Sequence, residues 1–453
     1  MLRTGRKAQL FAVLAASSLV AASCGGDDDD DAGEAPPEET TEATSTETTE
    51  AASTATTAAA STATTGASSE TTEGSTATSG AAAAECPNGD SVFLFVPFEG
   101  NQPVGVNWRA GIEHAVGEIN DAGGILGCQI TTEFQDTQAD PDVSKQVVAE
   151  GVEKDPYAIL GTVFSSSTVV NMIEAQRAEI PMFVGAEAPS ITNREENGDN
   201  DFIFRTSFGS DNAAPKLVNY MVEQGVESVD IVYKNDEYGA GGSAAHKAQF
   251  EEAGITIGQE ILVQPDQSDL SGEVTQLAGS DSQAVFVFLT ELETAAFLDE
   301  VQNQALDKPL YGSDVLVSGS VIELAQPGAA NGAQAHVGLS ANAPVFADWI
   351  AAHEAFHPGI TGVDHNNIKG WLSVHMVKEL TEQVGSFDRL ALAEIAHCNT
   401  EMTVANEPGL LMDFAIDGNG DIDRDSFIIE VVDGVGQVVA DAPRLDNLAE
   451  RGC

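Results

Sequence analysis

From Ser91 onward the sequence alternates short apolar runs with stretches of helical periodicity, and this alternation constrains the fold more than any other feature. Unbroken apolar runs are typical of strands buried on both faces, and a regular strand–helix order builds right-handed βαβ units around a parallel sheet. The runs expected to form strands are 91–98, 129–134, 158–163, 181–184, 228–233, 255–263, 284–289 and 309–311. The alternation restarts near residue 212, which predicts an α/β fold of two similar, doubly wound, parallel-sheet lobes. Ligands of open α/β sheets lie beyond the carboxyl ends of the strands, so we expect a ligand cleft between the lobes.

One strand end carries an unusual run of hydroxyl side chains. The apolar run Ile159–Phe164 is followed by Ser165–Thr168, and a helical pattern continues from Val169. The first N–H groups of a helix are free, and its dipole favours negative charge there. The serines therefore either cap the helix without a ligand or take part in an anion site, and this segment alone leaves both interpretations open.

The N-terminus has the pattern of an export signal. Basic residues precede an apolar core, Ala8–Val20, and small residues lead into Cys24. Residues 1–23 therefore read as a signal peptide, and the segment resembles the lipobox of bacterial lipoproteins. That resemblance implies cleavage before Cys24 and lipid attachment to its thiol; ordinary cleavage, with Cys24 incidental, is the alternative. No later apolar run approaches the length of a membrane span, so we expect an anchored protein and not a spanning one.

Residues 24–85 are a low-complexity stretch of Asp, Thr, Ser, Ala and Glu. Almost no residue in this stretch could build a core, so we predict a disordered tether that joins the anchor to the folded part. The expected location is extracytoplasmic, at the cell membrane.

The chain is strongly acidic, with 72 Asp and Glu against 19 Lys and Arg. Nucleic acid is excluded as a partner, because little could neutralise its phosphates. The acidity is either a solvated surface or a means of attracting cationic ligands, and its even spread favours the first interpretation.

Besides Cys24 the chain has four cysteines, an even number that suggests disulfides in an exported protein. Cys86 precedes the first expected strand and Cys128 precedes the second, and the starting ends of neighbouring parallel strands lie side by side. We therefore predict the pair Cys86–Cys128, and Cys398–Cys453 follows by elimination.

An ordered set of motifs then resembles the branched-chain amino-acid (leucine/isoleucine/valine) type of periplasmic binding protein. The matching segments are Gly111–Glu113, Glu118–Gly127, Asp136, Asp140–Pro141, Ser165–Thr168, Arg205–Thr206, Glu237–Gly239, Gly312–Asp314 and Asp417–Asp421. The resemblance covers nearly all of residues 90–440. It implies a solute-binding protein of an ABC importer with a type I periplasmic-binding fold. By this analogy the lobes are joined by three crossover segments, near Arg205–Phe208, Val337–Ala341 and Leu410–Ala415.

The resemblance also implies ligand-binding residues. Ser165, with Ser166 second, would hold the ligand's α-carboxylate, and the backbone carbonyl of Ala186 would hold its α-ammonium. Asp314 would pair with that ammonium from the second lobe, and Tyr238 would be a cleft tyrosine. Such a set makes physical sense, because helix-start donors suit an anion and a carboxylate suits a cation.

Three positions depart from the family pattern. Glu187 stands where leucine binders have a threonine, and Val104 and Thr290 stand where they have tyrosines. If Glu187 faces the cleft, it and Asp314 form a pair of carboxylates that favours additional positive charge on the ligand. Such a pocket would suit an extra amino, amide or guanidino group, whereas a solvent-facing Glu187 would have no such effect.

Two patterns imitate metal sites. His353-Glu354-Ala355-Phe356-His357 is a literal H-E-x-x-H, but Pro358-Gly359 follows at once and must end the helix. The alternating acids Asp417–Asp425 lack the glycine and glutamate of a calcium loop. We therefore expect no metal, no cofactor and no enzymatic activity.

The leading hypothesis is a monomeric, lipid-anchored binding protein that captures a small amino acid or a related amide or amine for a membrane permease. Lobe 1 is expected at residues 86–206 and 337–410, and lobe 2 at 207–336 and 411–453. A ligand-sensing receptor of the same fold is the alternative, and an exported zinc hydrolase using His353, Glu354 and His357 is a weaker one.

Overall fold

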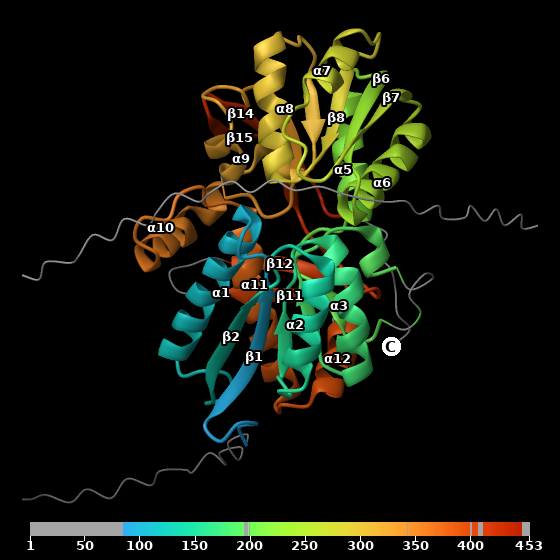
Figure 1. Cartoon of the computed structure of the whole chain (residues 1–453). Helices are drawn as coiled ribbons and strands as arrows, with labels where there is room; N and C mark the ends of the chain where they lie inside the picture. The colour runs from blue at the N-terminus through green and yellow to red at the C-terminus, as the bar shows by residue number, and fades with distance from the viewer. Residues whose placement is uncertain are drawn as a thin grey trace, which may run out of the picture. The chain divides into compact units, whose positions relative to one another are not determined.

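The computed structural model describes residues 85–193, 198, 200–341, 343–398, 401–405 and 411–445. Within these residues the chain forms two α/β lobes, each built on its own largely or wholly parallel sheet (Figure 1). The predicted fold class is therefore confirmed. Cys24, the signal segment and nearly all of the tether lie outside the described residues.

The first lobe is built on a five-stranded parallel sheet in the order β2-β1-β3-β4-β5. Its strands are β1 (Ser91–Phe98), β2 (Gln129–Asp136), β3 (Ala158–Leu160), β4 (Met182–Val184) and β5 (Ile203–Arg205). Alternate side chains of β1 enter different cores: Leu94 and Val96 pack on one face of the sheet and Phe95 on the other. This two-sided burial is why β1 is an unbroken apolar run.

Helices cover both faces of this sheet. One core contains α1 (Pro103–Asp121), α10 (Ala347–Phe356), α11 (His365–Val384) and α12 (Arg389–Cys398). The opposite core contains α2 (Pro141–Val152) and α3 (Ser165–Ala178). Helix α3 starts at Ser165 and not at Val169, so the hydroxyl run forms its first turn.

The second lobe is built on a seven-stranded sheet in the order β15-β14-β10-β9-β8-β6-β7. The parallel strands are β6 (Ser228–Lys234), β7 (Thr256–Val263), β8 (Ala284–Phe288), β9 (Leu310–Gly312) and β10 (Ala333–Val337). The antiparallel hairpin β14 (Ser426–Val432) and β15 (Val435–Ala442) extends one edge. The helices are α5 (Ser210–Glu223), α6 (Glu237–Ala253), α7 (Ser271–Ala278), α8 (Glu291–Gln304) and α9 (Gly319–Leu324).

Three crossover segments join the lobes. Two of them, between β5 and α5 and after β10, lie where the resemblance implied them. The third does not, because β12 (Leu411–Ile416) and β13 (Ile422–Asp423) form a small antiparallel sheet with β11 (Met402–Ala405). Apolar side chains of this small sheet belong to the first core. The chain therefore crosses between β13 and β14, about a dozen residues after the expected boundary at 410/411.

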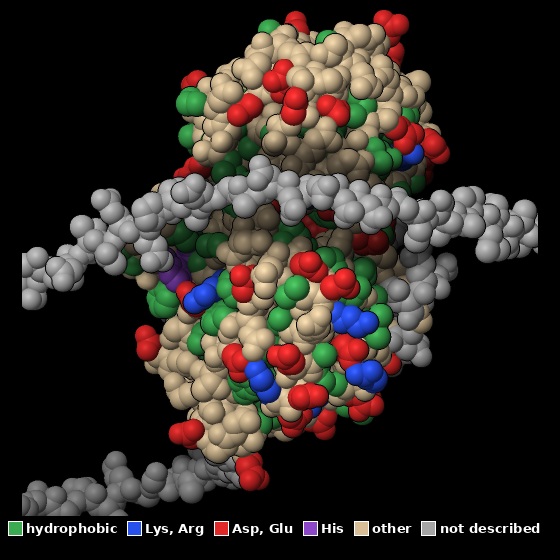
Figure 2. Space-filling model, in the orientation of Figure 1, with side chains coloured by type: hydrophobic (Ala, Val, Ile, Leu, Met, Phe, Trp, Pro, Cys, Tyr) green, Lys and Arg blue, Asp and Glu red, His purple; other side chains and the backbone are tan. Residues whose placement is uncertain are grey.

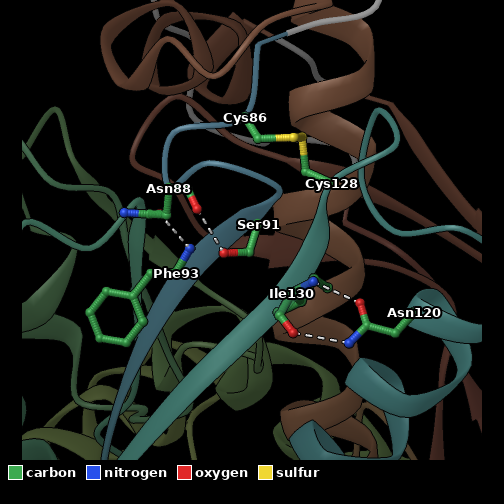
Figure 3. The surroundings of a disulfide bond; sticks show 7 residues. All are labelled: Cys86, Asn88, Ser91, Phe93, Asn120, Cys128 and Ile130. Carbon is green, nitrogen blue, oxygen red and sulfur yellow. Dashed lines mark hydrogen bonds between the residues drawn. A yellow bond between two sulfur atoms is a disulfide. The ribbon is translucent and has the colours of Figure 1, made fainter.

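Cys86 and Cys128 form the first predicted disulfide, with their Cα atoms 5.7 Å apart (Figure 3). Strands β1 and β2 pair in register from Ser91 and Gln129, which brings the two cysteines together as expected. Asn120 reinforces the start of β2, because its side chain exchanges two hydrogen bonds with the backbone of Ile130. Cys398 is also disulfide-bonded, and Cys453, its predicted partner, lies outside the described residues.

Acidic side chains are spread over the visible face of both lobes and do not gather in one patch (Figure 2). This distribution supports a solvated acidic surface. None of the helices in the described ranges is long and apolar enough to cross a membrane.

Candidate functional site

A pocket lies between the lobes at the carboxyl ends of their parallel strands. Its volume is about 440 Å³, and part of this space is open to solvent. Ser165, Ser166 and Glu187 follow strands of the first sheet, and Thr290 and Asp314 follow strands of the second. The remaining lining residues are Val104, Val163, Phe164, Gly185, Asp236, Tyr238, Glu291, Val315, His365, Asn366 and Lys369.

The serine corner is not a capped helix end. Phe164 occupies the N-cap position of α3, and its side chain cannot cap. The hydroxyl of Ser165 accepts the N–H of Ala188 at 3.2 Å, and the hydroxyl of Ser166 accepts the N–H of Glu237 at 3.3 Å. Glu237 belongs to the second lobe, so Ser166 already bridges the cleft. The positive end of α3 consequently faces the pocket without a side-chain cap, as an anion site requires.

Glu187 faces the pocket, which answers the question that the sequence left open. Lys369 of α11 forms an ion pair with it. Lys369 Nζ lies 2.5 Å from Glu187 Oε1 and 3.1 Å from Asp314 Oδ2. His365, one turn earlier on the same face of α11, places Nε2 3.3 Å from Asp314 Oδ2. The extra positive charge expected from the ligand is therefore partly supplied by the protein itself.

The pKa values of these groups reflect burial and mutual contact. Burial, followed by the nearby charge of Asp314, raises the pKa of Glu187 to about 7. Burial alone would also raise the pKa of Asp314, but His365 and Lys369 hold it below the usual range. Burial would lower the pKa of Lys369, but Asp314 and Glu187 raise it. Burial lowers the pKa of His365, so Lys369 is the principal cation here at neutral pH.

The other residues that the resemblance implied, Tyr238, Thr290 and Ala186, all have hydrogen-bond partners within the protein. Tyr238 is buried in the pocket wall, where its hydroxyl donates to Ser313 Oγ at 2.8 Å. The Thr290 hydroxyl accepts from Lys234 Nζ at 2.7 Å and donates to Glu293 Oε2 at 2.5 Å. Both partners belong to the second lobe, as Thr290 does. The carbonyl of Ala186 accepts an N–H from the guanidinium of Arg205. A carbonyl oxygen has a second lone pair, so this contact does not decide whether Ala186 also holds the ligand's ammonium, and that role stays a prediction.

The H-E-x-x-H pattern forms no metal site. Helix α10 ends at Phe356, as the proline predicted, and Glu354 is exposed. His353 is buried in a stack on Trp349, with Nδ1 3.2 Å from His114 Nδ1, whereas His357 Nε2 contacts the carbonyl of Ala110. No group of three or more His, Cys, Asp or Glu side chains in the described ranges could hold a metal ion. This arrangement removes the basis of the zinc hydrolase interpretation.

Sequence reasoning missed seven of the lining residues: Gly185, Asp236, Glu291, Val315, His365, Asn366 and Lys369. Glu291 directly follows Thr290, so the strand-end rule could have found it. His365 and Lys369 are spaced by one helical turn in a stretch with few other charges, which is a signal for a shared face. Asn366 shows no comparable pattern.

The chain is similar in sequence to solute-binding proteins of two bacteria and in structure to a third. A Leu/Ile/Val-binding protein homologue of Brucella melitensis is 27% identical over 185 residues, which are 39% of this chain and 48% of that protein. The leucine-, isoleucine-, valine-, threonine- and alanine-binding protein of Pseudomonas aeruginosa is 24% identical over 71% of this chain and 83% of its own length. A solute-binding protein of an ABC transporter from R. palustris, solved with benzoate, has a TM-score of 0.70 at 18% identity, over 80% of this chain and 99% of its own.

The match to the first of the curated relatives thus spans about half of that protein's length. The family comparison reaches further, because the sequence profile of the periplasmic binding protein family matches residues 94–435. This range runs from within β1 to the start of β15 and includes every residue that lines the pocket. The chain therefore belongs to the periplasmic binding protein family.

Proposed function

We propose that this chain is the solute-binding protein of an ABC importer and that it captures a small amino acid or a related amide or amine between its lobes. The observation that carries the proposal is the pocket itself, which has the uncapped start of α3 on one side and the carboxylate of Asp314 on the other. The mechanism is binding and hinge closure about the three crossovers, without chemistry.

The relatives' names support a small carboxylate-bearing ligand. The Pseudomonas aeruginosa protein is named for five amino acids, and the R. palustris protein was solved with benzoate. Amino acids and benzoate share a carboxylate, which suits the positive end of a helix. Relatives of one fold differ in ligand through pocket side chains, so the second functional group is argued from this chain's own residues.

We further propose that the protein is monomeric and is anchored outside the cytoplasm through a lipid on Cys24, with residues 24–85 as its tether. The lipobox-like Ala21–Cys24 segment supports the anchor, and the low complexity of the tether supports its reach. The partner would be a membrane permease with a separate ATPase, because no phosphate-binding G-x-x-x-x-G-K-[ST] motif is present in the sequence.

The test is a thermal-shift screen of amino acids, amides and amines on the purified protein. A ligand at 100 times its Kd should stabilise the protein by about 2.7 kcal/mol. We expect Ser165→Ala and Asp314→Ala each to weaken the best ligand by about tenfold or more, because each removes a polar contact at one end of the pocket. Circular dichroism checks that both variants fold. Unchanged affinity in both folded variants would contradict this site.

A further inference from the structure

Two buried carboxyl oxygens in the second lobe line the pocket and have no hydrogen-bond partner among the residues that the structure describes. They are Oε1 of Glu291 and Oδ1 of Asp314. Glu291 is the first residue of α8 and follows β8, whereas Asp314 follows β9, and these two strands pair directly. Both acids therefore come from the same edge of the second sheet, and only 2% and 9% of their surfaces are exposed.

Buried carboxyl oxygens in native proteins nearly always accept hydrogen bonds, because leaving them unmade is costly. These two atoms lie at a ligand pocket and not in a sealed core, so a bound solute is the natural source of the missing donors. The amide nitrogen of Asn366, also buried in the lining, has no acceptor within the described ranges of the chain. Asn366 could donate to an oxygen of the same solute, while the two acids require nitrogen or hydroxyl donors.

The surrounding charges favour a cation over a neutral donor. The charged groups that act on Glu291 are Asp364, Asp314 and Lys369. Asp364 accepts from Ser320, and Lys369 is already held by Glu187 and by Oδ2 of Asp314. The charge of Lys369 therefore acts on three pocket carboxyls, but its ion pairs are with Glu187 and Asp314, and one cation cannot neutralise all three. Burial accordingly raises the pKa of Glu291 to about 8, as expected for a carboxyl without a cation of its own.

We infer that Glu291 and Asp314 form a subsite for a cationic nitrogen, and that the solute is a basic amino acid or an amine with more cationic groups than carboxylates. This inference rests on the proposed solute-binding function and names the ligand class of the same pocket. Glu291 then determines specificity: its carboxylate distinguishes a side-chain ammonium or guanidinium from an aliphatic end. A pocket for neutral branched-chain amino acids would have no use for this second acid.

The experiment compares solutes that differ only in the distal charge. L-Lysine and L-norleucine share a carbon skeleton, as do L-ornithine and L-norvaline, and each pair is titrated into the wild-type protein by calorimetry. We expect the cationic member of the better-bound pair to bind about tenfold or more tightly, as a charge-assisted hydrogen bond to a buried carboxylate would provide. Glu291→Gln should remove most of this preference. Glu300→Gln, which removes the same charge at the other end of α8, should keep it.

The outcomes separate the inference from the function on which it rests. Equal or tighter binding of the neutral partners by wild-type protein overturns the cation subsite and leaves the solute-binding proposal intact. A preference for cations that survives in Glu291→Gln, with near-ultraviolet circular dichroism showing native packing, also overturns the role of Glu291. If no amino acid, amide or amine in the wider screen binds the folded protein, the proposed function fails, and this inference fails with it.

Discussion

At the residue scale, the buried carboxyl groups of the pocket differ in pKa: His365 and Lys369 hold the pKa of Asp314 below its usual range, whereas the effect of burial dominates for Glu187 and Glu291. Burial raises the pKa of Glu187 to about 7 and that of Glu291 to about 8. Of the two, Glu187 has Lys369 2.5 Å away, whereas Oε1 of Glu291 is left without a hydrogen bond in the part of the chain that the structure describes. A cation that enters the pocket therefore acts mainly on the ionisation of Glu291.

Affinity for a cationic solute is predicted to rise with pH between about 6 and 8. The cation pairs with ionised Glu291, so below the pKa of about 8 in the folded protein binding must release a proton. The dissociation constant should fall by up to about tenfold per pH unit and level off above the pKa. Calorimetry in two buffers of different ionisation enthalpy measures the released proton. A flat profile in wild-type protein would contradict the prediction, and Glu291→Gln should flatten it.

Strand-end reasoning predicted part of this site and missed the rest for a physical reason. Ser165 and Asp314 follow strands within a few residues, and a parallel sheet places such residues at one edge. Lys369 lies on a helix 55 residues beyond Asp314, and an isolated helical lysine normally points to solvent. The packing of α11 in the first lobe, which includes its close contact with α1, turns Lys369 inward. The Arg205 contact that occupies the Ala186 carbonyl is likewise a tertiary feature with no local signal.

At the scale of elements, two glycines let the backbones of α1 and α11 pack directly against each other. A Cβ built on Gly111 would lie 1.9 Å from the carbonyl oxygen of Asn367, and one on Gly370 would lie 2.1 Å from that of Trp108. This close packing fixes the position of α11 and hence of Lys369.

The strands that periodicity predicted agree with the structure within a few residues, because their pattern is local. The β11–β13 sheet was missed because its attachment to the first core depends on contacts distant in sequence.

Gly370→Ala is therefore predicted to destabilise the protein by about 2 kcal/mol, because the added methyl group forces the two helices apart. Urea unfolding measures the free energy of unfolding. Gly272→Ala on α7 is the matched control, since no heavy atom lies within 4 Å of its Cβ position. That control should be neutral or should stabilise by up to about 1 kcal/mol through helix propensity. Equal stability of Gly370→Ala and wild type would show that α11 is not held by this contact.

At the scale of the whole molecule, hydrogen bonds between the lobes flank the pocket. Ser190 donates to Glu237 Oε1 at 2.6 Å near the start of α6. Ser320 of α9 donates to Asp364 Oδ2 at 2.8 Å, and Asp364 also caps α11, the helix that carries Lys369. Opening the cleft must break such bonds, so they contribute to how long a solute stays bound as well as to closure itself.

Ser320→Ala is predicted to accelerate solute dissociation by about tenfold, because a hydrogen bond to a charged acceptor contributes about 1.5 kcal/mol or more. Stopped-flow displacement of the bound solute measures the rate. The association rate should change much less, since the bond forms only as the lobes meet. Ser243→Ala is the control, because its hydroxyl donates to the Ala240 carbonyl within α6. Equal dissociation rates for Ser320→Ala and wild type would show that the solute leaves without breaking the Ser320–Asp364 bond.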